Sequence, residues 1–222
     1  MGESISDWSR FERLTPFRVR DVLLVASHFD HYLLEESGYL AEIMQEEYSD
    51  LNLSQAPRII HSPDARDALG LLRTREFDLV ITMTRVGEMD VKAFGTEAKR
   101  IVEGLPVVML SHNTRELATL SAGEGIDRIF VWTGDSRILL SICKLIEDER
   151  NVENDVRDGD VQVILLIEDS RRFYSMYLPL LYRQLVEQTT RLMGEGGNLH
   201  QKLLRLRARG KILLATDMNS AK

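Results

Sequence analysis

Short apolar runs alternate with segments of helical periodicity along this 222-residue chain, and this alternation constrains the fold more than any other feature. Apolar runs bounded by polar residues are typical of strands in a parallel sheet, because helices cover such strands on both faces. Between the runs, apolar residues recur at intervals of three and four, as on the buried face of a helix. The pattern predicts an α/β protein with a parallel sheet between layers of helices.

Five strands, each followed by a helix, are predicted in the first 150 residues, after an N-terminal arm. The strands are expected at "VLLV" (22–25), "RIIH" (58–61), "DLVITM" (78–83), "PVVML" (106–110) and "RIFVW" (128–132). Leu33 is expected to begin the buried stripe of the first helix, and Ser62 to cap the second helix with Pro63 in its first turn. Gly95 is expected to break the third helix. The fourth is predicted around Leu117 and Leu120.

A second unit is predicted after a charged stretch. Residues 149–160 carry seven charges in twelve positions, so a charged linker or an exposed helix extension is expected there. A strand "VQVILLI" (161–167), a long helical region (171–209) and a strand "KILLA" (211–215) follow. Pro179 should kink the helical region, and the glycines at 194, 196 and 197 should interrupt it. The predicted domains are an arm (1–20), a first domain (21–148), the linker (149–160) and a partial second domain (161–222).

The second unit repeats the opening of the first. "VILLIEDSRRFYSMYL" corresponds to "VLLVASHFDHYLL", and "KILLATDMNSA" corresponds to "RIIHSPDARDA". The second copy ends after its second strand, so the chain is expected to be a fragment of a longer protein. A strand-helix-strand unit cannot bury two apolar strands alone. We therefore expect its strands to dock on the first sheet or to pair with another copy, giving a homodimer, with exchange of the C-terminal segment as one route.

Composition excludes several functional classes. The net charge of -7 and the pI of about 5.3 argue against a nucleic-acid-binding protein. No apolar run approaches the roughly 18 residues that cross a membrane, and the N-terminus lacks the apolar core of a secretory signal. The single cysteine, Cys143, rules out an internal disulfide. A cytoplasmic location is therefore expected.

The first domain resembles the receiver domain of response regulators in phosphorelay signalling. The resemblance covers Val22 to Glu149 and rests on strand order and on "FDLVIT", "LPVVMLS" and "GIDRIFV". It implies a flavodoxin-like (βα)5 sandwich with a five-stranded parallel sheet. It also implies a site at the carboxyl ends of the strands, where an aspartate accepts a phosphoryl group. That chemistry needs a divalent cation held by oxygen ligands to neutralise the transferring oxygens.

The residues at the receiver positions do not suit this chemistry. The resemblance places the acidic pair on Ala26 and Ser27, the phosphoacceptor on Met83, the hydroxyl on Ser111 and the lysine on Trp132. Only the hydroxyl is retained. A thioether is no phosphoryl acceptor, and magnesium prefers oxygen ligands. A degenerate receiver without catalytic residues is therefore predicted, in which the Trp132 ring fills the space of cation and phosphate.

Carboxylates elsewhere offer alternatives. Asp30 and Asp90 are expected near the same edge and could be recruited. In the second copy, Glu168 and Asp169 match the acidic pair, which makes a partial magnesium site possible there. A solvated acidic loop that caps the helix is the other reading.

The second copy also resembles a region of bacterial proteins that place receiver-like domains ahead of a pyruvate phosphate dikinase or phosphoenolpyruvate synthase type ATP-binding domain. The resemblance rests on "VILLIEDSRRFYSMYLPLLY" through "LLRLRARGKILLATD" and includes no catalytic motif. It implies that ATP would bind only in a downstream domain.

Two polar clusters are open to two readings. Basic residues that could contact phosphate or an acidic partner are more typical of a solvated helix face; they are Lys202, Arg205, Arg207, Arg209 and Lys211. His28 and His31 flank Asp30 with a spacing that could suggest a metal, but a loop at the strand edge explains them better.

The leading interpretation is a non-catalytic signalling module, a pseudo-receiver that acts through protein-protein contacts, with a surface at the edge of the fourth and fifth strands. An active phosphoacceptor receiver is one alternative. An N-terminal regulatory fragment of a dikinase-like enzyme is the other. No enzymatic activity is expected of this chain itself.

Overall fold

The computed structural model describes residues 13–36, 56–112, 122, 123, 125–192 and 207–217. The chain divides into two compact units. We call residues 19–44 and 57–138 the five-stranded unit, and residues 1–18, 45–56 and 139–222 the two-stranded unit.

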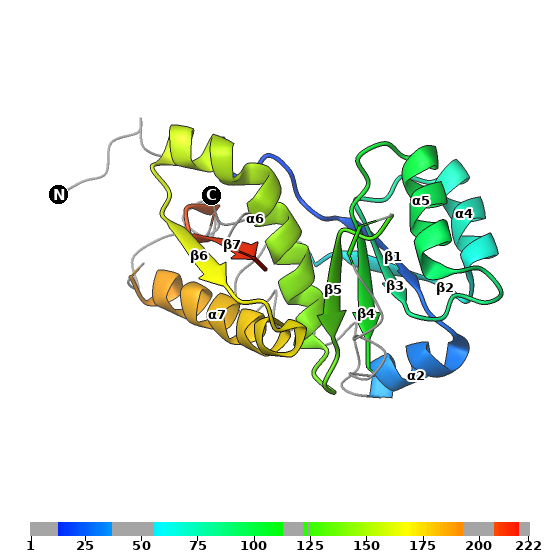
Figure 1. Cartoon of the computed structure of the whole chain (residues 1–222). Helices are drawn as coiled ribbons and strands as arrows, with labels where there is room; N and C mark the ends of the chain where they lie inside the picture. Colours follow the sequence, from blue (N-terminus) through cyan, green and yellow to red (C-terminus); the bar gives the residue numbers. More distant parts are fainter. Residues whose placement is uncertain (1–12, 37–55, 113–121, 124, 193–206, 218–222) are drawn as a thin grey trace. The chain divides into compact units, whose positions relative to one another are not determined.

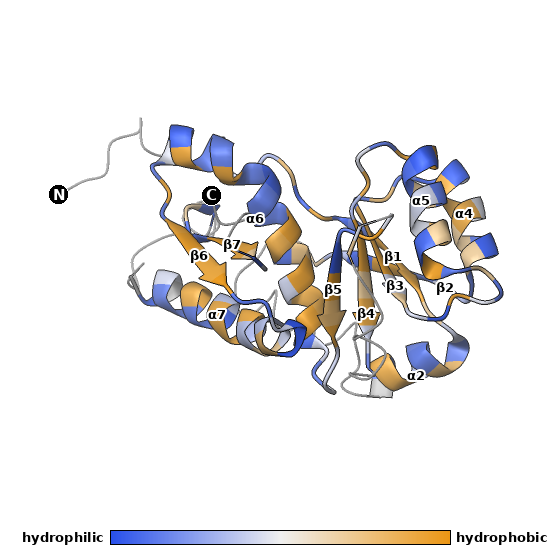
Figure 2. Ribbon diagram, in the orientation of Figure 1, coloured by the Kyte–Doolittle hydropathy of each residue, from blue (hydrophilic) through white to orange (hydrophobic). Residues whose placement is uncertain are grey.

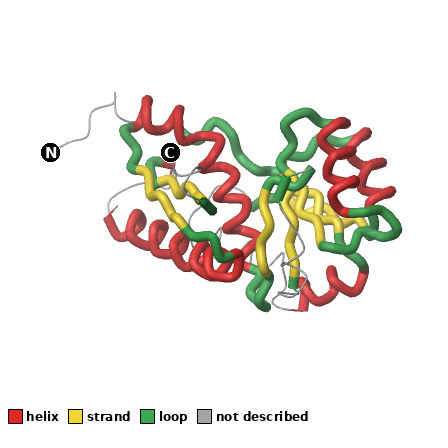
Figure 3. Tube along the Cα trace, in the orientation of Figure 1, coloured by secondary structure: helices red, strands yellow, loops and turns green. Residues whose placement is uncertain are grey.

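The five-stranded unit has the predicted alternation of strands and helices. Its elements are β1 (Asp21–Val25), α2 (His28–Glu36), β2 (Arg58–Ser62), α4 (Ala65–Thr74), β3 (Leu79–Met83), α5 (Val91–Ile101), β4 (Val107–Ser111) and β5 (Arg128–Val131). The strands are parallel in the order β2-β1-β3-β4-β5 (Figures 1 and 3). This is the flavodoxin-like order, so the predicted fold class is confirmed.

The core explains why the inner strands are apolar on both faces. Every residue of β3 and β4 is buried, and β1 is buried except at its half-buried first residue. Leu23, Val80 and Val107 contribute to a cluster that also contains the buried faces of α4 and α5. These two helices lie side by side in the views of Figures 1 and 3. The predicted α4 stripe of Ala65, Ala68, Leu69 and Leu72 is buried in this cluster.

Two helix starts differ in detail from the prediction. The N-cap of α4 is Asp64, whose carboxylate accepts the Asp67 N–H at 3.0 Å, and not Ser62. Ser62 instead ends β2 and donates its hydroxyl to the Asp64 carbonyl. In α2 the fully buried leucine is Leu34, and Leu33 is half-buried.

Gly95 does not break α5, which is continuous from Val91 to Ile101. A Cβ on Gly95 would lie 2.5 Å from the carbonyl oxygen of Gly125. Gly125 in turn has a φ of +96° and approaches the α5 backbone as closely. Glycine is present because two backbones touch here, and this advantage exceeds the roughly 1 kcal/mol that glycine costs inside a helix.

The two-stranded unit contains the second copy. It comprises most of α6 (Arg137–Gly159), which begins in the five-stranded unit, with β6 (Val163–Ile167), α7 (Arg171–Leu192) and β7 (Lys211–Ala215). The strands β6 and β7 pair in parallel and form a sheet of their own. Pro179 lies inside α7, which runs unbroken past it. None of the described helices is both long and apolar enough to cross a membrane.

The charged stretch after residue 148 is a helix extension, one of the two expected alternatives, and not a linker. It continues α6 as far as Gly159. It is not exposed throughout, because Asn151 and Asp155 are fully buried and paired inside the unit. The predicted helix around residues 117–120 and the glycine interruptions at 194–197 lie outside the described residues.

Candidate functional site

The carboxyl edge of the five-stranded sheet brings together the receiver positions. Ala26 directly follows β1, Met83 ends β3, Ser111 ends β4 and Trp132 follows β5. The ladder places Met83 opposite Leu110, so these strands end at the same level. Ala26 and Met83 are buried and carry no oxygen in their side chains. The side chains at these two positions therefore offer no carboxylate to a hard cation.

Ser27 and Asp30 are engaged in capping α2. The Asp30 N–H donates to the Ser27 hydroxyl oxygen at 3.1 Å, and that hydroxyl donates to the Asp30 carboxylate at 2.8 Å. The Ser27 carbonyl accepts the His31 N–H. This arrangement is close to a capping box, which orders the first turn of a helix. The serine in the acidic-pair position thus has a structural role.

Asp90 is a helix cap as well. Its carboxylate accepts the backbone N–H groups of Lys92 and Ala93 at 3.0 and 3.1 Å, which satisfies the start of α5. The two acids that could have been recruited to the edge are therefore both caps. Asp30 alone keeps a further contact toward the edge, with His112 Nδ1 at 3.9 Å.

Trp132 and Ser111 are linked through their backbones, since the Trp132 N–H donates to the Ser111 carbonyl at 2.8 Å. Ser111 is fully buried. The indole Nε1 of Trp132 is also buried and has no hydrogen-bond partner among the described residues. An indole donates a proton and cannot carry the positive charge with which a lysine would read a phosphate.

Three histidines gather beside this edge, and sequence reasoning did not connect them. The rings of His31 and His61 stack with centroids 3.9 Å apart, and His28 lies edge-on to His61 at 5.7 Å. Burial first, and then the neighbouring His61, lower the pKa of His31, although Glu35 opposes the shift. The sequence shows only that His28 and His31 are close to each other, because His61 lies on the next strand.

This cluster is not arranged as a metal site. Stacked rings hold their nitrogens side by side, and His61 Nε2 lies 2.8 Å from the Ala26 carbonyl oxygen. A carbonyl only accepts, so that nitrogen carries the proton. Throughout the described ranges, no three histidine, cysteine, aspartate or glutamate side chains are placed to share a metal ion.

The two acidic residues of the second copy, Glu168 and Asp169, differ in their burial and contacts. Glu168 is half-buried, and its carboxylate accepts the Ser170 N–H at 2.9 Å just ahead of α7. Asp169 is exposed. Two carboxylates could still offer oxygens to magnesium, but one already has a role at the start of the helix. The capping reading accounts for what is observed, and a cation here remains a prediction.

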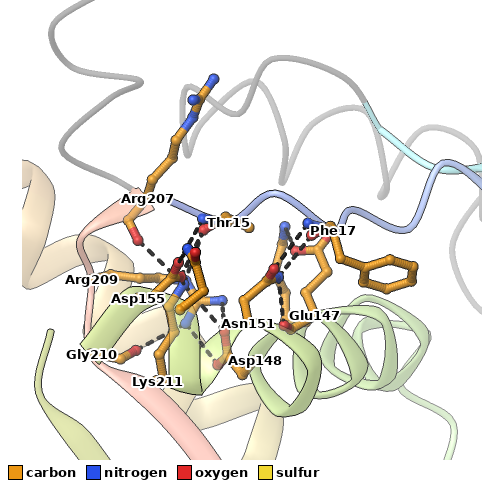
Figure 4. A network of polar contacts seen from close by, with 12 residues as sticks. Thr15, Phe17, Glu147, Asp148, Asn151, Asp155, Arg207, Arg209, Gly210 and Lys211 are labelled. Carbon is orange, nitrogen blue, oxygen red and sulfur yellow. Dashed lines mark hydrogen bonds and ion pairs between the residues drawn. The ribbon is translucent and has the colours of Figure 1, made fainter. Parts of the chain in front are cut away.

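The two-stranded unit contains a buried ionic network that was not predicted from the sequence. Figure 4 shows Asp148 and Asp155 on α6 beside Arg209 and Lys211. Arg209 donates to both carboxylate oxygens of Asp148 at 2.8 and 2.9 Å, and Lys211 Nζ lies 2.7 Å from Asp155. Arg209 and Lys211 were expected on a solvated helix face, which is wrong. Lys202 and Arg205 lie outside the described residues.

The network also holds the N-terminal arm. Thr15 donates its N–H to Asp155 at 2.8 Å, and Asn151 both donates to and accepts from the Phe17 backbone (Figure 4). Asp148, Asn151 and Asp155 follow the apolar stripe of α6 at helical intervals. A polar stripe that continues an apolar one was the available sequence signal.

Two opposing effects set the charge state of Arg209. Burial disfavours the guanidinium, but the Asp148 carboxylate outweighs burial and raises the pKa of Arg209 above its ordinary value. The pKa of Tyr182, which donates to Asp148 at 3.1 Å, is raised by burial and then by that carboxylate. Arg209 is therefore charged, and its contact with Asp148 serves the structure of this unit.

The comparisons with known proteins concern fold. The sequence matches no protein-family model and no curated protein. A signal receiver domain from Pseudomonas fluorescens is 22% identical, with a TM-score of 0.42 over 63% of this chain and 94% of its own. A receiver domain protein from Methanospirillum hungatei is 18% identical, with a TM-score of 0.47 over 61% of this chain and 98% of its own. A chemotaxis response regulator of Vibrio cholerae is 17% identical, with a TM-score of 0.44 over 58% and 98%.

Proposed function

We propose that this chain is a non-catalytic signalling module whose five-stranded unit is a pseudo-receiver that works through protein contacts. The observation that carries the proposal is the pair of buried side chains at the centre of the carboxyl edge, Ala26 and Met83. A receiver needs oxygen ligands at the first position and a nucleophilic carboxylate at the second. Methyl and thioether groups supply neither.

The nearby acids support this proposal, because each has another role. Asp30 bonds to Ser27, and Asp90 caps α5. Moving either toward Met83 would leave a helix start unsatisfied, at a cost of about 1 kcal/mol. Trp132 also lacks the charge that reads a phosphate. These features oppose the alternative of an active phosphoacceptor receiver.

The proposed working surface is the edge formed by β4 and β5. The strand β5 is the last strand in the order of the described sheet. The partners we propose for this edge are protein surfaces.

The test is incubation of the full chain with acetyl phosphate and magnesium, followed by intact-mass spectrometry. A receiver domain with a complete acidic set serves as the positive control. We expect no phosphoryl adduct on this chain under conditions that modify the control. An adduct mapped to the five-stranded unit, with a matching loss after hydroxylamine treatment, would refute the proposal.

A further inference from the structure

Strand β6 has an open edge. Among the described residues it pairs only with β7, where the Lys211 N–H donates to the Gln162 carbonyl and the Glu168 N–H to the Ala215 carbonyl. Backbone groups alternate in direction along a strand, so every second residue faces away from β7. The residues whose N–H and C=O groups point to the open edge are Val163, Leu165 and Ile167.

On the opposite edge of this small sheet, one backbone group is bound by a buried side chain. The Ile212 N–H of β7 points away from β6 and donates to the Asp148 carboxylate at 2.9 Å. Asp148 lies on α6 and is held in place by Arg209. The unit thus satisfies the outward N–H of Ile212 with a buried charged group, whereas the described residues include no such contact to the outward backbone groups of β6.

The side chains at the open edge are apolar and exposed. Val163, Leu165 and Ile167 share one face of the strand and are 43, 45 and 51% exposed. Figure 2 shows β6 as apolar along its length. Edge strands of soluble proteins usually carry a lysine, a proline or a bulge that prevents pairing, and β6 carries none of these.

The internal repeat indicates what this edge is suited to. β1 is the counterpart of β6 in the five-stranded unit, and it pairs with β2 on one side and β3 on the other. Its residues Leu23 and Val25, which correspond to Leu165 and Ile167, are fully buried. Corresponding apolar residues are therefore buried in β1 of the five-stranded unit and exposed in β6 of the two-stranded unit.

We propose that β6 pairs with β6 of a second copy of this chain, antiparallel about a two-fold axis at Leu165. In this register Leu165 lies opposite its own equivalent, and Val163 lies opposite Ile167 of the partner copy. The groups that point to the open edge are those that each opposite pair exchanges as two hydrogen bonds. The exposed side chains of both copies then lie on one continuous apolar face.

The sequence of β6 suits a copy of itself. In this register Glu168 falls opposite Gln162 and Asp169 opposite Val161, so no carboxylates face each other. Centring the pairing on Ile167 would place Glu168 opposite Leu166. An isologous contact also closes at two copies, because each β6 edge is then covered by the β6 edge of the other copy. The inference uses only the two-stranded unit and goes beyond the proposed function of the five-stranded unit.

The first test is sedimentation velocity of the full chain over a range of concentrations. We expect a monomer-dimer equilibrium that Leu165→Lys weakens by about tenfold or more, because two like charges would face each other at the axis. The matched control is Leu180→Lys, at a leucine 57% exposed on α7. It should leave the equilibrium unchanged, and circular dichroism should show both variants folded. A monomer at all concentrations, or equal weakening by both variants, would overturn the proposal.

The second test fixes the register by disulfide trapping. Leu165→Cys should cross-link rapidly on oxidation, because Cα atoms of a hydrogen-bonded antiparallel pair are about 5.5 Å apart, within disulfide range. Ile164→Cys should not, because its own equivalent lies diagonally about 7–8 Å away. The native Cys143 is buried and serves as the background in both. Failure of Leu165→Cys to cross-link in a dimer, as in an exchanged C-terminal segment, would contradict the β6 pairing.

Discussion

Replacing Asp148 by alanine should strongly destabilise the two-stranded unit. The Asp148 carboxylate accepts two hydrogen bonds from Arg209, one from the Tyr182 hydroxyl and one from the Ile212 N–H, and it is fully buried. Alanine would leave the Arg209 charge buried, with the Gly210 carbonyl as its remaining hydrogen-bond acceptor among the described residues. Breaking a buried ion pair on one side costs about 3–5 kcal/mol, and we expect a loss in that range.

The assay is urea unfolding followed by circular dichroism, with hydrogen exchange at the Ile212 amide as the local signal. Asp148→Asn should lose less than alanine, because the amide oxygen still accepts hydrogen bonds. Arg183→Ala is the control, since it removes a solvent-exposed pair with Glu187 on α7 and should cost only about 0–1 kcal/mol. A loss below about 1 kcal/mol for Asp148→Ala, or unchanged exchange at Ile212, would refute the reasoning.

Three further predictions concern the five-stranded unit. Gly95→Ala should lower the urea midpoint, since its Cβ would meet a backbone carbonyl oxygen at 2.5 Å, at a cost of about 1–3 kcal/mol. Gly70→Ala should raise the midpoint, because its Cβ would meet nothing within 4 Å. A higher midpoint for Gly95→Ala than for Gly70→Ala would contradict the packing. Asp90→Ala should cost about 1 kcal/mol of unfolding free energy, but Asp90→Asn only a few tenths, because both a carboxylate and an amide can cap a helix. If both variants lost the same unfolding free energy, the negative charge of Asp90 and not its hydrogen bonds would be the stabilising feature. His31 should titrate below 6.5 by NMR, so stability should fall as the pH drops through 6.5, where the unfolded chain binds the proton more tightly. His61→Gln should raise that midpoint, and no change would exclude the proposed coupling.

The periodicity of the sequence was sufficient to predict an α/β protein with a parallel sheet between helices. Buried parallel strands and amphipathic helices have strong patterns, and the apolar stripe of α4 was read correctly residue by residue. The continuous α5 was not predicted, because Gly95 is explained by a backbone more than twenty residues further along the chain. Local rules treat such a glycine as a helix breaker.

The polar interior was harder to predict than the apolar one. Asp155 and Lys211 are both charged and each looks solvent-exposed in its own segment, but together they form a buried pair. Whether a charged side chain is buried depends on a partner that is distant in sequence. The stacking of His31 on His61 was missed for the same reason. Met83 was correctly predicted to end a strand, because the apolar run before it is a strong local pattern.

The central claim is that the carboxyl edge of the five-stranded sheet holds neither a divalent cation nor a phosphoryl group. The most direct measurement is an NMR titration of the full chain with magnesium, then with beryllium fluoride, following the amides of Ala26, Met83 and Ser111. The account predicts no saturable shift at these amides at concentrations that saturate an intact receiver. Saturable shifts centred on Met83 and Ala26 would contradict it.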